Sequence, residues 1–176
     1  MAAHRSETAV QAVALAALSE FAALTECLYT VRLKQLMLDK GCVTSIIEAM
    51  AAHPIDPAVQ ACASAALANL ALWATSEQCD EIVGQVLEPL QAAMTAHRSE
   101  TLVQVPALAA LHCLAICTAA GKQSMLDKGC LTSITDAMAA HPSDGDVQAS
   151  ASCALQNLAF GQTREQCDKI LEQALE

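Results

Sequence analysis

The residue types that could bind a metal gather at one place in the chain. His112 and Cys113 are adjacent, and Cys117 follows Cys113 by four residues. On a helix this spacing puts both cysteines on one face, and thiolate and imidazole are ligands that zinc prefers. A structural zinc site needs four ligands, and the sequence has no CxxC or HxxxH pair to supply the others. We therefore expect no metal and no other cofactor.

Histidines and carboxylates also recur, but their spacing is typical of structure rather than catalysis. One histidine occurs in each repeat, at His4, His53, His97 and His141, so we interpret it as a turn or packing device. A group of charged residues is also repeated, and we interpret it as a solvated helix face. It consists of Glu77, Asp80 and Glu81 in the first copy and of Glu165, Asp168 and Lys169 in the second. The sequence has no Gly-rich phosphate loop and no GxSxG nucleophile motif. We predict that the chain is not an enzyme.

The composition favours helices that pack through small side chains. Hydrophobic residues make up 54% of the chain and aromatic residues only 2%, with six Gly and five Pro. Ala and Leu are the strongest helix formers, so the fold class is all-α. The net charge of −10 argues against a nucleic acid as partner, because phosphates would be repelled. A basic or neutral protein fits better, although acidity that only maintains solubility stays an alternative.

The nine cysteines lie at helical positions beside Ala and Leu. This pattern indicates apolar thiols in a reducing compartment rather than a disulfide framework. The N-terminus, MAAHRSETAVQ, has no secretory signal, so we expect a cytoplasmic protein. The uncharged stretch 101–121 has the length of a membrane span, but it contains Gln104, Pro106 and His112, and its counterparts are amphipathic. We predict no membrane insertion.

Internal repeats determine the architecture. A histidine followed six residues later by Val-Gln occurs four times, with spacings of 49, 44 and 44 residues. The string MLDKGC stands at 37–42 and again at 125–130, and EQCD stands at 77–80 and again at 165–168, in both cases 88 residues apart. A block of two units has therefore been duplicated.

Each unit is predicted to contain three helices. In the second unit a short helix, about 31–38, ends before Gly41, and a second helix, about 43–52, stops at His53-Pro54. The third begins with Asp56 as N-cap and Pro57 at the first helical position. The same order returns at 126–129, 131–140 and 144–160. In the unit between, Gln85 replaces the boundary glycine, and Pro106 predicts a kink or a late start of the third helix.

The strings VQACASAALANLA (59–71) and VQASASCALQNLA (147–159), with GCVTSIIEAM and GCLTSITDAM before them, resemble the armadillo repeat. The version with Met and His at the end of the second helix is most similar to the armadillo regions of large leucine-rich-repeat kinases and of many protist proteins. The resemblance implies one domain, a right-handed α-solenoid of about four three-helix units. The units span about 1–30, 31–75, 76–119 and 120–161, with a partial unit at 162–176.

The resemblance also implies a concave groove lined by third helices, in which an Asn hydrogen-bonds the backbone of an extended ligand. The positions that match are Glu20, Asn69, Cys113 and Asn157, so only half of them carry the amide. Trp73 follows Asn69 by one turn, whereas nuclear-import adaptors of this family carry Trp one turn before the Asn, which argues against an import role. Two alternatives stay open: each Asn bridges neighbouring helices, and Trp73 packs under a loop.

Two functions follow from this reading. The first is a scaffold that binds a protein or peptide through the groove, with Glu20, Asn69, Trp73, Cys113 and Asn157 as contact residues. The second is a structural subunit or a fragment of a longer array. In that reading the ends, which lack polar caps, contact neighbours or further copies of the chain.

Overall fold

The computed structural model describes residues 14, 16, 28–72, 74–116 and 118–175. Glu20, Trp73 and Cys117 lie outside this part of the chain. The described residues form helices without a strand, which confirms the predicted all-α class. The helices are α2 (Leu28–Asp39), α3 (Cys42–Ala52), α4 (Pro57–Ala71), α5 (Ser76–Ala96), α6 (Thr101–Ala115), α7 (Ala119–Asp127), α8 (Cys130–Ala140), α9 (Gly145–Ala159) and α10 (Arg164–Leu175).

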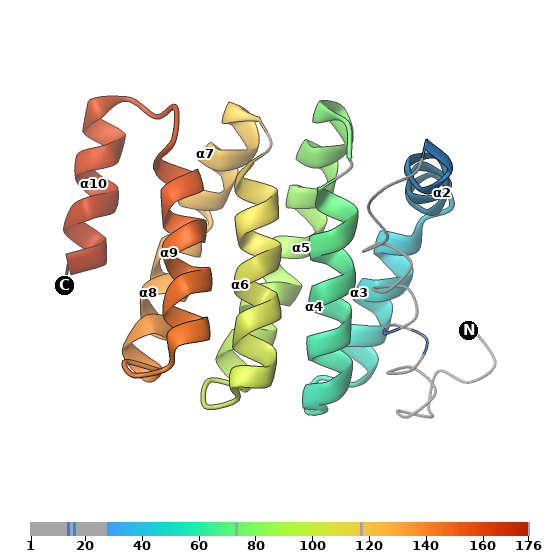
Figure 1. Cartoon of the computed structure of the whole chain (residues 1–176), viewed down its shortest axis with the longest axis horizontal. Helices are drawn as coiled ribbons and strands as arrows, with labels where there is room; N and C mark the ends of the chain where they lie inside the picture. Colours follow the sequence, from blue (N-terminus) through green and yellow to red (C-terminus); the bar gives the residue numbers. More distant parts are fainter. Residues whose placement is uncertain (1–13, 15, 17–27, 73, 117, 176) are drawn as a thin grey trace.

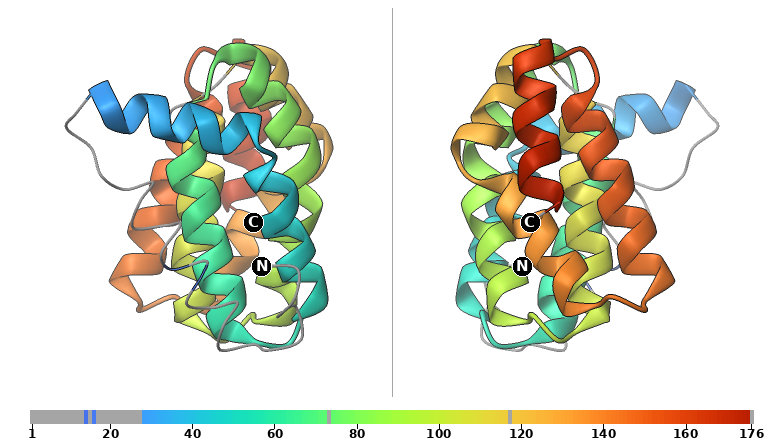
Figure 2. Two further views of the ribbon diagram at one scale, coloured as in Figure 1. Left: turned by 90° about the vertical axis from the view of Figure 1, so that its right-hand side faces the viewer. Right: turned by 90° about the vertical axis from the view of Figure 1, so that its left-hand side faces the viewer.

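The helices form a row of layered units. Helices α4, α6 and α9 stand side by side in one layer, and α3, α5 and α8 lie behind them (Figure 1). Helix α6 packs against both α4 and α9. Helix α2 lies across the direction of the other helices at one end of the row (Figure 2). The helices that begin at Asp-capped or equivalent positions in successive units are therefore neighbours in space, although they are 44 residues apart in the chain.

The boundary glycines act as predicted in two units. Gly41 and Gly129 have φ angles of 73° and 75° and precede α3 and α8. A side chain with a Cβ is strained in this left-handed region, so glycine allows the sharp change of direction between the first and second helices. In the unit between, Gln85 stands at this position, and α5 continues without a break from 76 to 96. The prediction of three helices is therefore wrong for this unit, which has two.

The third helices start where the sequence predicts. The Asp56 carboxylate accepts hydrogen bonds from the backbone N–H groups of Ala58 (2.9 Å) and Val59 (3.1 Å). Asp144 caps α9 in the same way. Helix α6 begins at Thr101 and runs through Pro106 to Ala115. The predicted late start at Pro106 is therefore wrong, because the helix has already completed its first turn before the proline.

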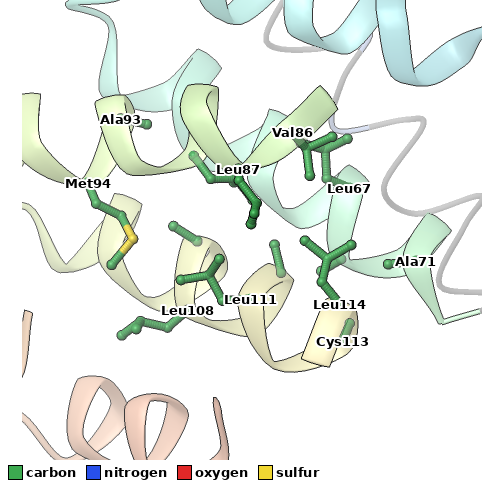
Figure 3. Close-up of a cluster of buried hydrophobic side chains, with 14 of the residues drawn as sticks. Leu67, Ala71, Val86, Leu87, Ala93, Met94, Leu108, Leu111, Cys113 and Leu114 are labelled. Carbon is green, nitrogen blue, oxygen red and sulfur yellow. The ribbon is translucent and has the colours of Figure 1, made fainter. Parts of the chain in front are cut away.

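The core lies between the layers. Figure 3 shows Leu67 of α4, Leu87 of α5 and Leu111 of α6 converging in one buried cluster, and each is at most 1% exposed. Fully buried alanines line the contacts between third helices, among them Ala63 and Ala107. Such small side chains let neighbouring helices approach closely, so the Ala-rich composition is a consequence of helix packing.

A repeated glutamine ties each third helix to the second helix of its own unit. The Nε2 group of this glutamine donates to two backbone carbonyls at the end of the second helix, 10 and 7 residues earlier. The bonds are Gln60 to Met50 (2.9 Å) and His53 (2.8 Å), Gln104 to Met94 (2.7 Å) and His97 (3.0 Å), and Gln148 to Met138 (2.9 Å) and His141 (3.0 Å). This glutamine clamp gives the helix-end carbonyls a side-chain donor in addition to the backbone N–H groups of the turn, which reach the carbonyl oxygens of His53, His97 and His141 at 3.0 to 3.2 Å.

The repeated histidine joins a unit to the one before it at two places in the described chain. The Nε2 of His97 lies 2.9 Å from the carbonyl oxygen of Pro54, and that of His141 lies 2.8 Å from the carbonyl of Arg98. A carbonyl only accepts, so Nε2 carries the proton in both rings. At His97 and His141 the interpretation as a turn or packing device is confirmed, and His4 lies outside the described residues.

The uncharged stretch 101–121 does not form one long helix. It is divided between α6 and α7, and Thr118 caps α7 by accepting from the N–H of Gly121 at 2.9 Å. None of the helices in the described part of the chain is long and apolar enough to cross a membrane.

The glutamine clamp predicts a measurable loss of stability. Gln148→Ala removes two hydrogen bonds, and the carbonyl oxygens of Met138 and His141 keep only their bonds from backbone N–H groups, so we expect the free energy of unfolding to fall by about 2 kcal/mol. Gln156→Ala, on the exposed side of the same helix, is the matched control and changes stability by less than about 0.5 kcal/mol. Urea unfolding followed by circular dichroism measures both. Equal midpoints for the two variants would show that the clamp contributes nothing.

Candidate functional site

The outward stripes of α4, α6 and α9 form the surface that we call the third-helix face. Residues at spacings of four, three, four and three lie on one side of a helix, and equivalent positions in the three helices are 44 residues apart. All but one of these residues are at least partly exposed. The face consists of Ala58, Cys62, Ala65, Asn69 and Leu72; Leu102, Pro106, Ala109, Cys113 and Ile116; and Asp146, Ser150, Cys153, Asn157 and Phe160.

This face is almost uncharged in an acidic protein. Asp146 is the one charged residue among the fifteen, whereas the whole chain has a net charge of −10. Exposed carboxylates lie instead on α5, at Glu77, Asp80 and Glu81, as predicted for a solvated face. The third-helix face therefore offers small apolar and neutral polar groups to a partner.

One end of the face carries a row of large apolar side chains. Leu72, Ile116 and Phe160 each follow the last residue of a third helix, and they are 49%, 54% and 76% exposed. We call these three residues the apolar row. Lys122 orders its last member: the ammonium nitrogen lies 2.5 Å from the carbonyl oxygen of Phe160 and 5.5 Å from the centre of its ring. A cation over an aromatic face is an attractive arrangement.

The asparagines of this face bond within the protein. The Nδ2 of Asn157 donates to Nδ1 of His112 (2.9 Å) and lies 3.3 Å from the His112 carbonyl oxygen. Asn157 therefore bridges α9 to α6, as the alternative from the sequence supposes. Asn69 is half-buried in α4 and is not free either. An extended ligand would have to compete with these contacts to use the amide donors.

Cys113 is the one buried residue of the third-helix face, so its thiol is not accessible to a partner as the sequence led us to expect. Its side chain is only 6% exposed, and burial raises the pKa of its thiol to about 11. The side chain belongs to the buried hydrophobic core. A thiol with this pKa is neutral at pH 7, so it is neither a nucleophile nor a ready metal ligand. The described residues also contain no group of three or more His, Cys, Asp or Glu placed to hold a metal ion.

The state of the cysteines differs from the expectation of free thiols throughout. Cys79, buried in α5, is disulfide-bonded. The other described cysteines form no disulfide: Cys42, Cys62, Cys113, Cys130, Cys153 and Cys167. Their helical positions beside Ala and Leu made all nine cysteines look alike in the sequence. A disulfide at Cys79 requires a second cysteine side chain close to it in the folded chain, and the spacing of cysteines along the sequence does not show which side chains are close.

Two features of this region were missed in the sequence. The glutamine clamp was visible only as the recurring Val-Gln after each histidine, and its role needed the position of the second-helix carbonyls. The apolar row was hidden because Leu72, Ile116 and Phe160 differ in type. The signal that could have found it is the 44-residue spacing of large apolar residues immediately after each third helix.

Comparison with protein-family models, with curated proteins and with solved structures gave no match. The functional conclusion therefore rests on the residues of the chain and their geometry.

The bridge between α6 and α9 gives a second prediction. Asn157→Ala removes the bonds to His112, so we expect the free energy of unfolding to fall by about 1 kcal/mol. Gln156→Ala, one residue earlier and exposed, changes it little. Chemical unfolding of the two purified variants makes the comparison. If Asn157→Ala is as stable as Gln156→Ala, Asn157 is not a bridge, and its amide is available to a ligand.

Proposed function

We propose that the chain is an armadillo-like, right-handed α-solenoid that serves as a non-catalytic interaction module. It binds a segment of a protein partner along the third-helix face. The regular succession of α4, α6 and α9, the left-handed glycines before α3 and α8, and the Asp-capped third helices support the armadillo-like reading. No single residue of this pattern specifies a partner, so the function is argued from the surface itself.

The observation that carries the proposal is the contrast between this face and the rest of the chain. A solvent-exposed surface gains nothing from three large apolar side chains in a row, and contiguous apolar patches mark interaction sites. The small residues Ala65 and Ala109 below the apolar row leave room for the backbone of a bound segment. The partner segment is therefore apolar or neutral where it touches the face, and basic residues beside it are attracted by the surrounding acidic charge.

The apolar row, rather than the asparagine pair, is the main anchor in this proposal. Burial of an exposed side chain gives roughly 25 cal/mol for each Å² of apolar surface removed from water. The amide of Asn157 already has partners in α6, so a ligand that displaced them would gain little. Asn69 and Asn157 then orient the segment, and Trp73 and Glu20 keep the roles implied by the resemblance.

The test uses a photo-crosslinking residue at Ala65 or Ala109 to identify the bound segment, which is then made as a peptide. We expect the triple variant Leu72→Ser, Ile116→Ser, Phe160→Ser to bind the peptide at least about tenfold more weakly, a loss of about 1.4 kcal/mol. Isothermal titration calorimetry measures the dissociation constant. Helicity stays unchanged because the three side chains are exposed.

The matched control is Ile55→Ser. Ile55 is 87% exposed in the turn before α4, away from the third-helix face, and its equivalents in the next two units are already Ser99 and Ser143. This variant should bind the peptide within a factor of about two of the unmodified chain. Equal affinity of the triple variant and this control would remove the third-helix face as the binding surface.

The second candidate function is a structural subunit that contacts further copies of the chain. The observation that favours it is the exposure of Leu171 (57%) on α10, in the partial unit that follows α9. This reading predicts that the purified chain associates at tens of micromolar, and that Leu171→Ser abolishes the association. Sedimentation velocity distinguishes the cases. A monomer at this concentration is incompatible with the subunit reading and leaves the interaction module in place.

A further inference from the structure

A hollow lies on the opposite side of the molecule from the third-helix face, between α3 and α5. Its volume is about 410 Å³, within the range of small-ligand sites. The walls come from the C-terminal half of α3 and the following turn, at Ile47, Met50 and Pro54, and from the second half of α5, at Pro89 and Ala92. The lining is apolar except for Gln60 of the glutamine clamp and Glu88.

We call the contact between the second helices of neighbouring units a seam. The hollow lies in the seam between α3 and α5, and polar contacts join the equivalent seam between α5 and α8. There the Nε2 of Gln91 donates to Oγ of Ser133 and to the carbonyl oxygen of Lys128, both at 3.1 Å. A second contact joins Arg98 to Asp136, with 3.6 Å between the guanidinium and carboxylate. These bridges hold the two second helices together across the seam.

The residues that make these bridges are replaced in the α3–α5 seam. Forty-four residues earlier, Ile47 and Pro89 stand in place of Gln91 and Ser133, and Pro54 and Ala92 stand in place of Arg98 and Asp136. None of the four can make a side-chain hydrogen bond. The hollow is therefore a specific departure from the repeat, in which four polar groups that close a seam have become apolar groups that line an opening.

We propose that this hollow binds a small apolar ligand that carries a cationic amine. The hydrocarbon part lies between α3 and α5, because burial of apolar surface against Ile47, Pro89 and Ala92 removes it from water. Glu88, the charged residue of the lining, receives the amine. An anionic amphiphile of the same size is disfavoured by Glu88 and by the net charge of −10. The site lies apart from the third-helix face and does not depend on partner binding there.

The probes are N-phenyl-1-naphthylamine, an uncharged fluorophore that brightens in apolar sites, and three eight-carbon competitors. The fluorophore should bind the full chain at one saturable site. Octylammonium should displace it at a concentration several-fold lower than octanol, and octanoate should be weaker than either. If the fluorophore does not bind, or if octanoate competes as well as octylammonium, the proposal is wrong.

Two double variants close the hollow with residues that the chain itself uses in the equivalent seam. They are Ile47→Gln with Pro89→Ser, and Pro54→Arg with Ala92→Asp. Each should weaken fluorophore binding by about tenfold or more, which corresponds to about 1.4 kcal/mol. Thermal unfolding verifies that each variant is folded. The control is Ile55→Ser. Ile55 is an exposed apolar residue that does not line the hollow, so this variant should bind the fluorophore as the unmodified chain does.

Glu88→Gln tests the amine contact separately. This variant keeps the size of the side chain, so fluorophore affinity should be unchanged, while octylammonium should lose its advantage over octanol. Unchanged fluorophore binding in both folded double variants would place the probe elsewhere and overturn the site. An unchanged preference for octylammonium in Glu88→Gln would overturn the role of the carboxylate.

Discussion

The architecture depends on satisfying the carbonyl groups at the end of each second helix. The chain must turn there to start the third helix, and the last carbonyls of a helix lack the N–H donor that a continuing helix would supply. The glutamine clamp provides a side-chain donor from the first turn of the third helix, at Gln60, Gln104 and Gln148, beside the backbone N–H groups of the turn. The histidine that bears the second of these carbonyls bonds the preceding unit through its ring, at His97 and His141. One short motif thus fixes the angle within a unit and the stacking between units.

The duplication of a two-unit block makes neighbouring units unequal. Gly41 and Gly129 permit a sharp turn between the first and second helices, whereas Gln85 keeps α5 continuous. Cavities of about 360 and 370 Å³ recur beside the two glycine turns, at residues 88 apart in the sequence. The seams alternate in the same way, since polar side chains bridge α5 to α8 and apolar ones leave a hollow between α3 and α5. The variation that distinguishes one unit from the next lies where second helices meet.

The third helices behave differently, because fourteen of the fifteen residues of the third-helix face are uncharged and its large apolar residues gather mainly at one end. Helix α6 packs between α4 and α9, so only a narrow stripe of α6 faces solvent, whereas α9 also exposes Ala149, Ser152 and Gln156. Leu72, Ile116 and Phe160 end these stripes at the same level. The arrangement favours a partner that lies across several helices over one that fills a single pocket. The proposed ligand hollow on the other side is confined to the contact between α3 and α5, whereas the third-helix face extends over three helices.

The sequence by itself determined the all-α class, the 44- and 88-residue periods, the left-handed glycines and the Asp-capped third helices, because each depends on local backbone chemistry. It did not determine that α5 is continuous. Gly84, beside Gln85, could have ended a first helix there, but in the folded chain the helix continues through both residues. Tertiary structure alone decided that Cys113 is buried, that Cys79 is paired and that Asn157 bonds His112. Those outcomes depend on which residue of a neighbouring unit lies opposite, and distance along the chain does not specify it.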